Sequence, residues 1–329
     1  MKVPDWSYRT LFRPALFRLT SRQARDLTLL AIGGLGKLPW GSAVIRTLGH
    51  LDTSPLLQTK LADVQLKSPL GLSGGLDIHG TANKALSQFG FGFLEIGPIT
   101  MDKITSDLPI QRDLQREAII YPIEYENDGV EAITAQLKQN HKNKGKLPCM
   151  LRLKHSPEST LEHAIGEHQL LLDKLVPFAD GFYIDLLDHR WSLEHILEKL
   201  DSFIQVSRSI IATKPLFLYV PLDYPLDKLQ QLTQHSTTLQ WDGIVIGDMI
   251  HTDNGLEIGH EGKQLSIEKV RLLRGQLEVE HILIATAGIH EPQDALDWYS
   301  VRSIGQIWTE EGATLVEGCI DNFLRSWFR

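Results

Sequence analysis

The chain has 329 residues, 42% of them hydrophobic and 22% charged, and its formal net charge is −8 at pH 7. This composition is typical of a globular domain, and the negative charge argues against a general nucleic-acid-binding surface, so no nucleic-acid partner is expected. The two cysteines, Cys149 and Cys319, are too few for a disulfide framework or a thiolate zinc site, and no apolar run approaches the roughly 20 residues of a transmembrane helix.

Residues 1–50 predict a helical extension that precedes the main domain, residues 51–329. Arg and Lys outnumber the acids in this extension, and its apolar residues recur at helical spacing. Thr20 and Gln23 have the spacing of a capping box, which predicts the start of a second helix.

The extension has two interpretations. It is a helical flap packed on its own domain, which is the usual fate of an amphipathic helix, or it lies on an anionic membrane surface. Leu16, Phe17 and Leu27 are expected on one apolar surface. No secretory signal is evident, so we expect a cytoplasmic protein, peripheral on the inner face of the cell membrane if that apolar surface faces outward.

From Leu61 onward, short β-rich runs alternate with amphipathic helical segments. The run LADVQLKSPLGL suggests a hairpin that leads into a first strand, and seven further strands are expected at GFLEIG, CMLRLK, GFYIDL, LFLYVPL, GIVIGD, ILIATAG and IGQIWT. Eight strands with intervening helices predict an α/β fold, a (β/α)₈ TIM barrel, with an open doubly wound sheet as the alternative. Residues 101–145 exceed a normal crossover and predict an insertion over the barrel mouth.

In such barrels the functional site lies at the carboxyl ends of the strands. The sequence places mainly acids and histidines there, namely Ser73, Asp77, His79, Glu95, Arg152, Lys154, His155, Asp185, Asp188, His189, Tyr219, Asp223, Asp248 and His251. Several are metal-ligand types, but no tight His-x-His pair is present, so surface histidines are the preferred reading and no metal site is expected. A metal-dependent hydrolase or lyase is therefore the weakest alternative.

The order of several blocks resembles the class 2, membrane-associated dihydroorotate dehydrogenases, which are FMN-dependent barrels. The likeness begins with LFRPALFRLTSRQARDLT, continues through SPLGLSGGLDIHG and FGFGFLEIGPIT, and resumes at WDGIVIG, GHEGKQLS and AGI. In that family the amino-terminal helices form a quinone tunnel at the membrane surface. The resemblance implies cofactor-binding positions at Gly74, Gly75, Asp77, Gly259, Gly262, Gly288 and Thr309.

The chain departs from the family pattern where the flavin chemistry would be carried. The lysine that faces the flavin after Gly-Leu-Asp is replaced by Ile78, and the strand-five lysine is replaced by Tyr219. The strand-three asparagine becomes Arg152, the block with the base serine becomes DLLDHR, and the phosphate-site Tyr-Ser-Gly becomes WTE, which begins at Trp308. A lysine stabilises the negative charge of a reduced flavin far better than a neutral tyrosine hydroxyl does. We therefore expect FMN to be absent.

Three functions follow from this pattern. A degenerate homologue would keep the barrel for binding or regulation, with Asp77 as a helix cap and the glycines as a retained turn. An enzyme with altered chemistry would use Asp188 and His189 as catalytic acid–base groups. The third is a functional quinone-linked dihydroorotate dehydrogenase of pyrimidine biosynthesis with unusual site residues.

The pocket itself gives a sharper expectation. A ligand smaller than FMN would contact Asp188, His189 and Arg152, with Asp185 and Tyr219 as further substrate-binding residues. The competing interpretation is that Arg152 and Asp185 form a structural ion pair.

Overall fold

The computed structural model describes residues 16, 18–48, 58–113, 115–116, 118–122, 126–141, 147–235, 240–259, 261–278, 281–287 and 314–318, the last for the backbone only. The expected positions Phe17, Gly288, Trp308 and Thr309 lie outside these residues.

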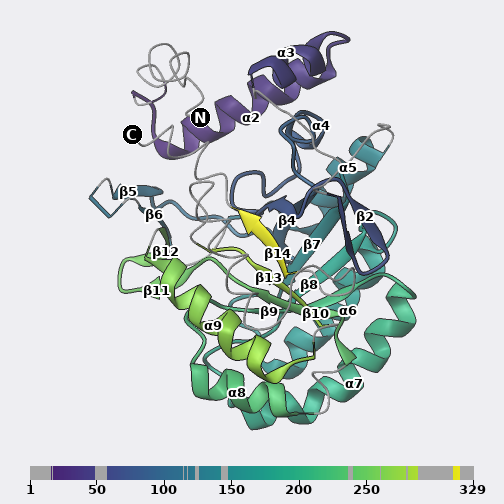
Figure 1. Cartoon of the computed structure of the whole chain (residues 1–329). Helices are drawn as coiled ribbons and strands as arrows, with labels where there is room; N and C mark the ends of the chain where they lie inside the picture. Colours follow the sequence, from purple (N-terminus) through teal and green to yellow (C-terminus); the bar gives the residue numbers. More distant parts are fainter. Residues whose placement is uncertain are drawn as a thin grey trace.

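Eight parallel strands close into a barrel, which confirms the expected fold (Figure 1). In their order around the barrel they are β3 (Leu70–Leu72), β4 (Phe93–Ile99), β7 (Cys149–Lys154), β8 (Gly181–Asp185), β9 (Leu216–Val220), β10 (Gly243–Ile246), β13 (Ile282–Ala285) and β14 (Thr314–Gly318). Strands β4, β8, β9 and β10 are buried along their whole length, which explains their near-continuous apolar runs.

The described barrel helices are α4 (Asn83–Leu86), α5 (Gly129–His141), α6 (Leu161–Leu175), α7 (Leu193–Ile211), α8 (Leu226–Gln234) and α9 (Gly262–Gln276). In Figure 1, α6 to α9 follow one another around the outside of the sheet. Thr160 and Ser192 begin α6 and α7, because each side-chain oxygen accepts a hydrogen bond from a backbone N–H of the first turn.

The structure corrects two expectations, one about the eighth barrel strand and one about residues 101–145. The strand that closes the barrel between β13 and β3 is β14, farther along the chain than the expected IGQIWT, which lies outside the described residues. Two short apolar runs stand close together here, and periodicity alone cannot choose between them. The insertion expected at residues 101–145 is present but shorter: β5 and β6 belong to it, whereas α5 is the crossover helix between β4 and β7.

A four-stranded antiparallel sheet, called the lid sheet, is built from two distant segments. It contains β5 (Gln111–Asp113), β6 (Ala118–Tyr121), β11 (Ile250–Thr252) and β12 (Gly255–Gly259), in the order β11-β12-β6-β5. Its buried residues pack in a single apolar cluster with Ile78 and Met249, which belong to the loops after β3 and β10. The lid sheet therefore rests on the carboxyl-end loops of the barrel.

The interior of the barrel is packed rather than open. A hairpin of β1 (Thr59–Leu61) and β2 (Val64–Leu66) buries Leu61 and Leu66 against the inward-facing Phe93 and Met150. Tyr183, Phe217 and Tyr219 belong to the same cluster, as expected for a barrel whose interior is a filled core.

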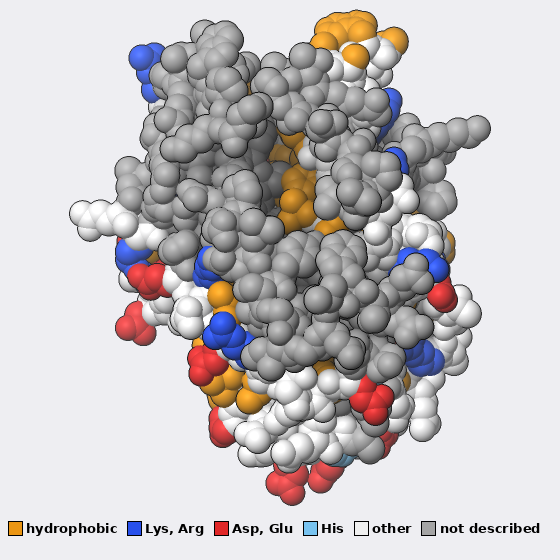
Figure 2. All heavy atoms as spheres, viewed as in Figure 1, with side chains coloured by type: hydrophobic (Ala, Val, Ile, Leu, Met, Phe, Trp, Pro, Cys, Tyr) orange, Lys and Arg blue, Asp and Glu red, His pale blue; other side chains and the backbone are white. Residues whose placement is uncertain are grey.

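The described part of the extension forms α2 (Ser21–Lys37) and α3 (Gly41–Leu48). The Thr20 capping box is confirmed. Helix α2 packs on α4, and a Cβ added at Gly36 would lie 3.0 Å from the Ala85 Cβ. The helices also keep apolar residues on their outer side, since Leu30 and Trp40 are 68% and 58% exposed. Figure 2 shows hydrophobic atoms gathered at the top of the view, where Figure 1 places the tip of this helical pair.

Candidate functional site

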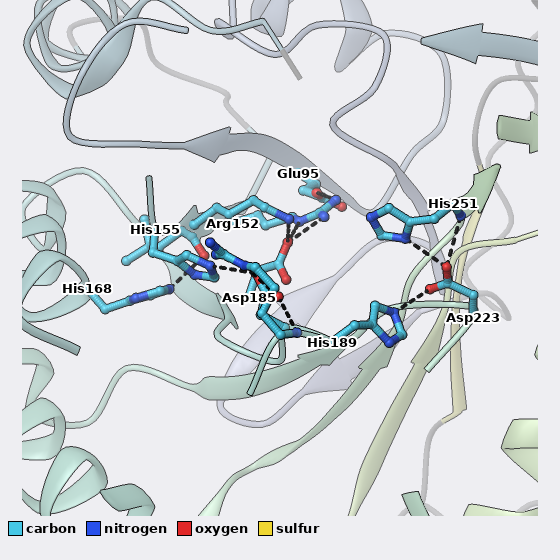
Figure 3. Close-up of polar contacts among 12 residues, drawn as sticks. Glu95, Arg152, His155, His168, Asp185, His189, Asp223 and His251 are labelled. Atoms are coloured by element: carbon cyan, nitrogen blue, oxygen red, sulfur yellow. Dashed lines mark hydrogen bonds and ion pairs between the residues drawn. The ribbon is translucent and has the colours of Figure 1, made fainter. Parts of the chain in front are cut away.

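A buried polar cluster, called the mouth cluster, occupies the carboxyl ends of the barrel strands (Figure 3). It is formed by Ser73, Glu95, Arg152, Asp185, Tyr219 and Asp248, each no more than 5% exposed. These residues come from β4, β7, β8 and β9 and from the loops after β3 and β10. The parallel barrel brings them together because all its strands end on the same side.

Arg152 is the centre of the mouth cluster. Its Nε and Nη2 donate hydrogen bonds to Asp185 Oδ2 at 3.0 and 2.6 Å, and its Nη1 lies 3.9 Å from Glu95 Oε1. The guanidinium carbon lies 3.7 Å from the centre of the Tyr219 ring, which is a cation–π contact. The structural ion pair between Arg152 and Asp185, the competing interpretation of the pocket, is therefore present.

The charges of the mouth cluster are unevenly balanced. Asp185 has a second cation beside Arg152, since Lys154 Nζ lies 3.5 Å from Asp185 Oδ2. Asp248 instead accepts a hydrogen bond from the neutral Ser73 hydroxyl, at 3.1 Å. Burial raises the pKa of Asp185, but Lys154 and Arg152 outweigh it and lower the pKa to about 2. Burial, only partly offset by Arg152, raises the pKa of Glu95 to about 7, and burial likewise raises the pKa of Asp248. The cluster thus stabilises one firmly ionised carboxylate and disfavours ionisation of the other two.

Asp188, an expected acid–base group, is held by other residues. Its Oδ2 lies 3.3 Å from His155 Nε2, and the Arg190 guanidinium donates to both carboxylate oxygens at 2.7 to 3.0 Å. Burial raises its pKa, but the hydrogen bonds from His155 and Arg190 dominate and lower the pKa below its ordinary value. A carboxylate with a lowered pKa is a weak proton acceptor, so Asp188 is poorly suited to act as a base.

His189, the other expected acid–base group, faces away from Arg152 in Figure 3. Its Nε2 lies 3.3 Å from Asp223 Oδ1, and Asp223 also contacts His251. Arg152, Asp188 and His189 therefore have three different sets of partners, and their joint contact with a ligand remains a prediction.

The expected cofactor-binding positions that the structure describes have local structural roles. Both Asp77 oxygens accept backbone N–H groups, from Thr81 and Ala82, at 2.7 Å, so Asp77 caps the turn that leads into α4. A Cβ at Gly74 would lie 2.5 Å from the Gly97 carbonyl oxygen. Close approach of two backbones therefore suffices to explain this glycine.

The other expected cofactor-binding glycines differ in what surrounds them. A Cβ at Gly262 would lie 2.8 Å from Leu222 Cδ2, whereas one at Gly75 would meet only Ile258 Cδ1, at 3.8 Å. Gly259 ends β12, opposite Ala118 of β6. A Cβ at Gly74 would thus meet backbone, whereas one at Gly262 or Gly75 would meet only side-chain atoms.

The residues at the barrel mouth do not fit the flavin that the resemblance implies. The face of the Tyr219 ring, which the resemblance puts in the place of a flavin-contacting lysine, is covered by the Arg152 guanidinium. Ile78, which the resemblance puts in the place of the second lysine, is 3% exposed within the apolar cluster beneath the lid sheet. The ionised Asp185 carboxylate lies beside this guanidinium, and it would oppose the negative charge of a reduced flavin.

A separate cavity of about 650 Å³ lies between α2 and the barrel. Leu29, Leu30, Leu76, Ile78 and Ile104 form its apolar wall, whereas the remaining lining is polar: Arg22, Arg25, Asp26, His79, Thr81, Lys103, Thr105, Ser106, Asp107, Glu126, Asn127 and Asp128. A cavity of this size and mixed lining suits a small amphipathic ligand.

Sequence reasoning placed Glu95 and Asp248 at the mouth but gave them no role. An acid inside an apolar strand, as in GFLEIG, was the available signal, because a buried carboxylate requires a partner. The contact of Asp223 with two histidines was missed entirely, since it joins three different segments.

Known proteins with similar sequences cover most of this chain. The family model for dihydroorotate dehydrogenase matches residues 56–186. A dihydroorotate dehydrogenase (quinone) of Haemophilus ducreyi is 24% identical over 307 residues, which cover 85% of this chain and 88% of the relative. The protein of the same name from Acinetobacter baumannii is 24% identical over 340 residues, covering 95% and 98%.

Solved structures show the same fold. A dihydroorotate dehydrogenase from Eimeria tenella in complex with ferulenol has a TM-score of 0.74 at 18% identity, over 94% of this chain and 90% of that one. Its ligand-free form has a TM-score of 0.67 at 18% identity, over 87% and 89%. At this identity the likeness extends to the fold alone.

Proposed function

Because the chain belongs to the dihydroorotate dehydrogenase family, beside its quinone-dependent members, we propose that it is a barrel protein that has lost FMN binding and dihydroorotate oxidation. The observation that carries this proposal is the Arg152 guanidinium stacked on Tyr219 at the barrel mouth. The barrel would then serve binding or regulation rather than hydride transfer.

The proton chemistry supports the same proposal. The segment that resembles the family's base-containing block offers Asp188, whose carboxylate already binds Arg190 and contacts His155. Its lowered pKa disfavours proton uptake from a substrate carbon.

We expect the retained activity to be ligand binding in the cavity beneath α2. Leu29, Leu30 and Leu76 offer apolar contacts, while Arg25 and Lys103 offer positive charge for an anionic or carbonyl group. This occupant is proposed as a small amphipathic molecule. The quinones that give the relatives their name are one candidate class.

A second candidate is an active quinone-linked dehydrogenase with unusual site residues. The observation that favours it is similarity along almost the whole chain, 95% in the Acinetobacter baumannii comparison. The two candidates differ in whether the barrel holds a flavin, and one preparation distinguishes them.

The purified full-length protein is expected to be colourless and to show no visible flavin absorbance, even after incubation with FMN. It is also expected not to reduce a quinone analogue or a dye when dihydroorotate is added. The Acinetobacter baumannii relative, prepared and assayed in parallel, is the control. A yellow protein with dihydroorotate-dependent dye reduction would establish the second candidate instead.

The helices α2 and α3 are proposed to contact an anionic membrane surface. Among the described residues no helix is both long and apolar enough to cross a bilayer. The exposed Leu27 and Trp40 accompany the exposed cations Arg18 and Lys37, the combination that favours interfacial binding.

Leu27→Asp combined with Trp40→Asp is expected to reduce co-flotation with anionic vesicles by at least about tenfold, since each large apolar side chain contributes about 1.5–3 kcal/mol when buried. The matched control is Leu170→Asp, which changes a residue 54% exposed on α6. Equal flotation of the two variants would show that the helices do not contact the membrane.

A further inference from the structure

His189, Asp223 and His251, called the rim triad, lie outside the mouth cluster, in the segments that follow three neighbouring barrel strands. His189 follows β8, Asp223 follows β9, and His251 lies in β11, just after β10. Strand β9 pairs with both β8 and β10, so the three segments are direct neighbours. Figure 3 shows both imidazoles turned toward the Asp223 carboxylate.

The donor atoms of the rim triad are close together. His189 Nε2 lies 3.3 Å from Asp223 Oδ1, His251 Nδ1 lies 2.7 Å from Asp223 Oδ2, and all three donors lie within 4.8 Å of one another. The two imidazole rings are nearly perpendicular, at 86°, with their centres 5.5 Å apart. Two nitrogens and one carboxylate group therefore converge from three separate segments of the chain.

We propose that the rim triad binds a divalent transition-metal ion, Zn²⁺ in the first instance, through His189 Nε2, Asp223 and His251 Nδ1. Two histidines and one carboxylate are the ligand set of zinc sites that keep one coordination position open. Bonds of about 2.0–2.2 Å in a tetrahedron place neighbouring donors about 3.3–3.5 Å apart. The observed spacings need only small movements of exposed side chains to reach this geometry.

The surroundings keep the triad in place without metal. The His251 backbone N–H donates to Asp223 Oδ2 at 2.9 Å, which fixes the carboxylate in its loop. The His189 ring packs against Tyr224 with 5.9 Å between ring centres, and the buried Lys269 ammonium donates to the Tyr224 carbonyl oxygen from below. These contacts preorganise the donors, although the Lys269 charge moderates the affinity for a cation.

Solvent reaches the site. The side chains of His189 and His251 are 39% and 52% exposed, and that of Asp223 is 18% exposed. A metal ion can therefore enter, and the open coordination position would face water or an anionic ligand. Binding requires neutral imidazoles with the ring hydrogen on Nδ1 of His189 and Nε2 of His251, leaving the other nitrogens to coordinate. This inference is independent of the proposed loss of flavin chemistry.

The probe is Co²⁺ added to the full-length protein after treatment with a chelator. We expect a 1:1 complex with the visible absorption typical of four-coordinate Co²⁺, and equimolar Zn²⁺ should abolish that absorption. Each of His189→Ala, Asp223→Asn and His251→Ala should weaken Co²⁺ binding at least about 100-fold, because even loss of an outer-layer partner costs about 10–100-fold in metal affinity.

The matched control is His195→Ala, which removes another exposed histidine that faces a carboxylate, with its Nε2 3.1 Å from Glu162 Oε1. It should bind Co²⁺ as the parent protein does. Circular dichroism melting should show that the triad variants remain folded, as expected for exposed side chains. A folded parent protein with no visible Co²⁺ spectrum, or a spectrum that survives all three triad substitutions, would overturn the proposal and leave the triad as a hydrogen-bonded clamp between loops.

Discussion

Replacement of Arg152 by methionine is expected to lower the free energy of unfolding by about 3–5 kcal/mol, the usual cost of leaving a buried charge without its partner. Arg152 is 5% exposed and donates two hydrogen bonds to Asp185, which is 1% exposed. Lys154, at 3.5 Å, remains as a weaker partner and keeps the loss toward the lower end of this range. Urea unfolding followed by circular dichroism measures the effect.

Two further variants make this result specific. Arg190→Ala breaks an ion pair in which the arginine side chain is 45% exposed, so its cost should stay below about 1 kcal/mol. Arg152→Met combined with Asp185→Leu should recover much of the lost stability, because an apolar pair can replace a buried ion pair. Equal losses for Arg152→Met and Arg190→Ala would contradict the central role of the mouth cluster.

The Glu95→Gln variant is expected to gain stability relative to the parent protein as the pH rises. The folded-state pKa of Glu95 is raised to about 7 by burial, so the folded protein retains a proton that the unfolded chain has lost. The contribution of this bound proton to the free energy of unfolding is complete below the ordinary glutamate pKa. It is lost as the pH rises through the pKa of Glu95 in the folded protein. The loss is about 3 kcal/mol, since one pKa unit corresponds to about 1.36 kcal/mol.

Glutamine has no such proton to lose, so the difference in unfolding free energy between Glu95→Gln and the parent should grow in favour of the variant between about pH 4.5 and 8. Urea unfolding at several pH values measures this difference. The control is Glu261→Gln, because the hydrogen bond from Arg116 lowers the pKa of Glu261 and keeps it ionised throughout the interval. A difference for Glu95→Gln that does not change with pH would mean that Glu95 is already ionised in the folded state.

Much of the fold follows from local patterns. The amphipathic run LEHAIGEHQLLLDKL coincides with α6, and the Thr20 capping box marks the first turn of α2. These features depend on neighbouring residues, which periodicity and capping chemistry describe well. The lid sheet could not be predicted in this way, because β6 and β12 lie far apart in sequence and have four and five residues.

The candidate site, like the fold, could be predicted only in part from the sequence. The strand-end rule placed Arg152, Asp185 and His189 on the correct side of the barrel. It could not show that Arg152 stacks on Tyr219, or that His189 turns to Asp223, because these contacts depend on the curvature of the closed barrel. Pairings between different strands therefore became visible only in three dimensions.

The way in which the barrel closes has a consequence for the newly made chain. Strand β3 is the first barrel strand along the sequence, and its two neighbours are β4 and β14. Until residues 314–318 have been synthesised, one side of β3 has no backbone partner, and the unpaired side of β13 is in the same position. Unpaired strand edges attract other chains, and contacts between distant parts of a sequence form slowly. The edge of β3 therefore stays unpaired through most of elongation, whereas the edge of β13 is exposed only shortly before residues 314–318 emerge, so chaperone binding should centre on β3.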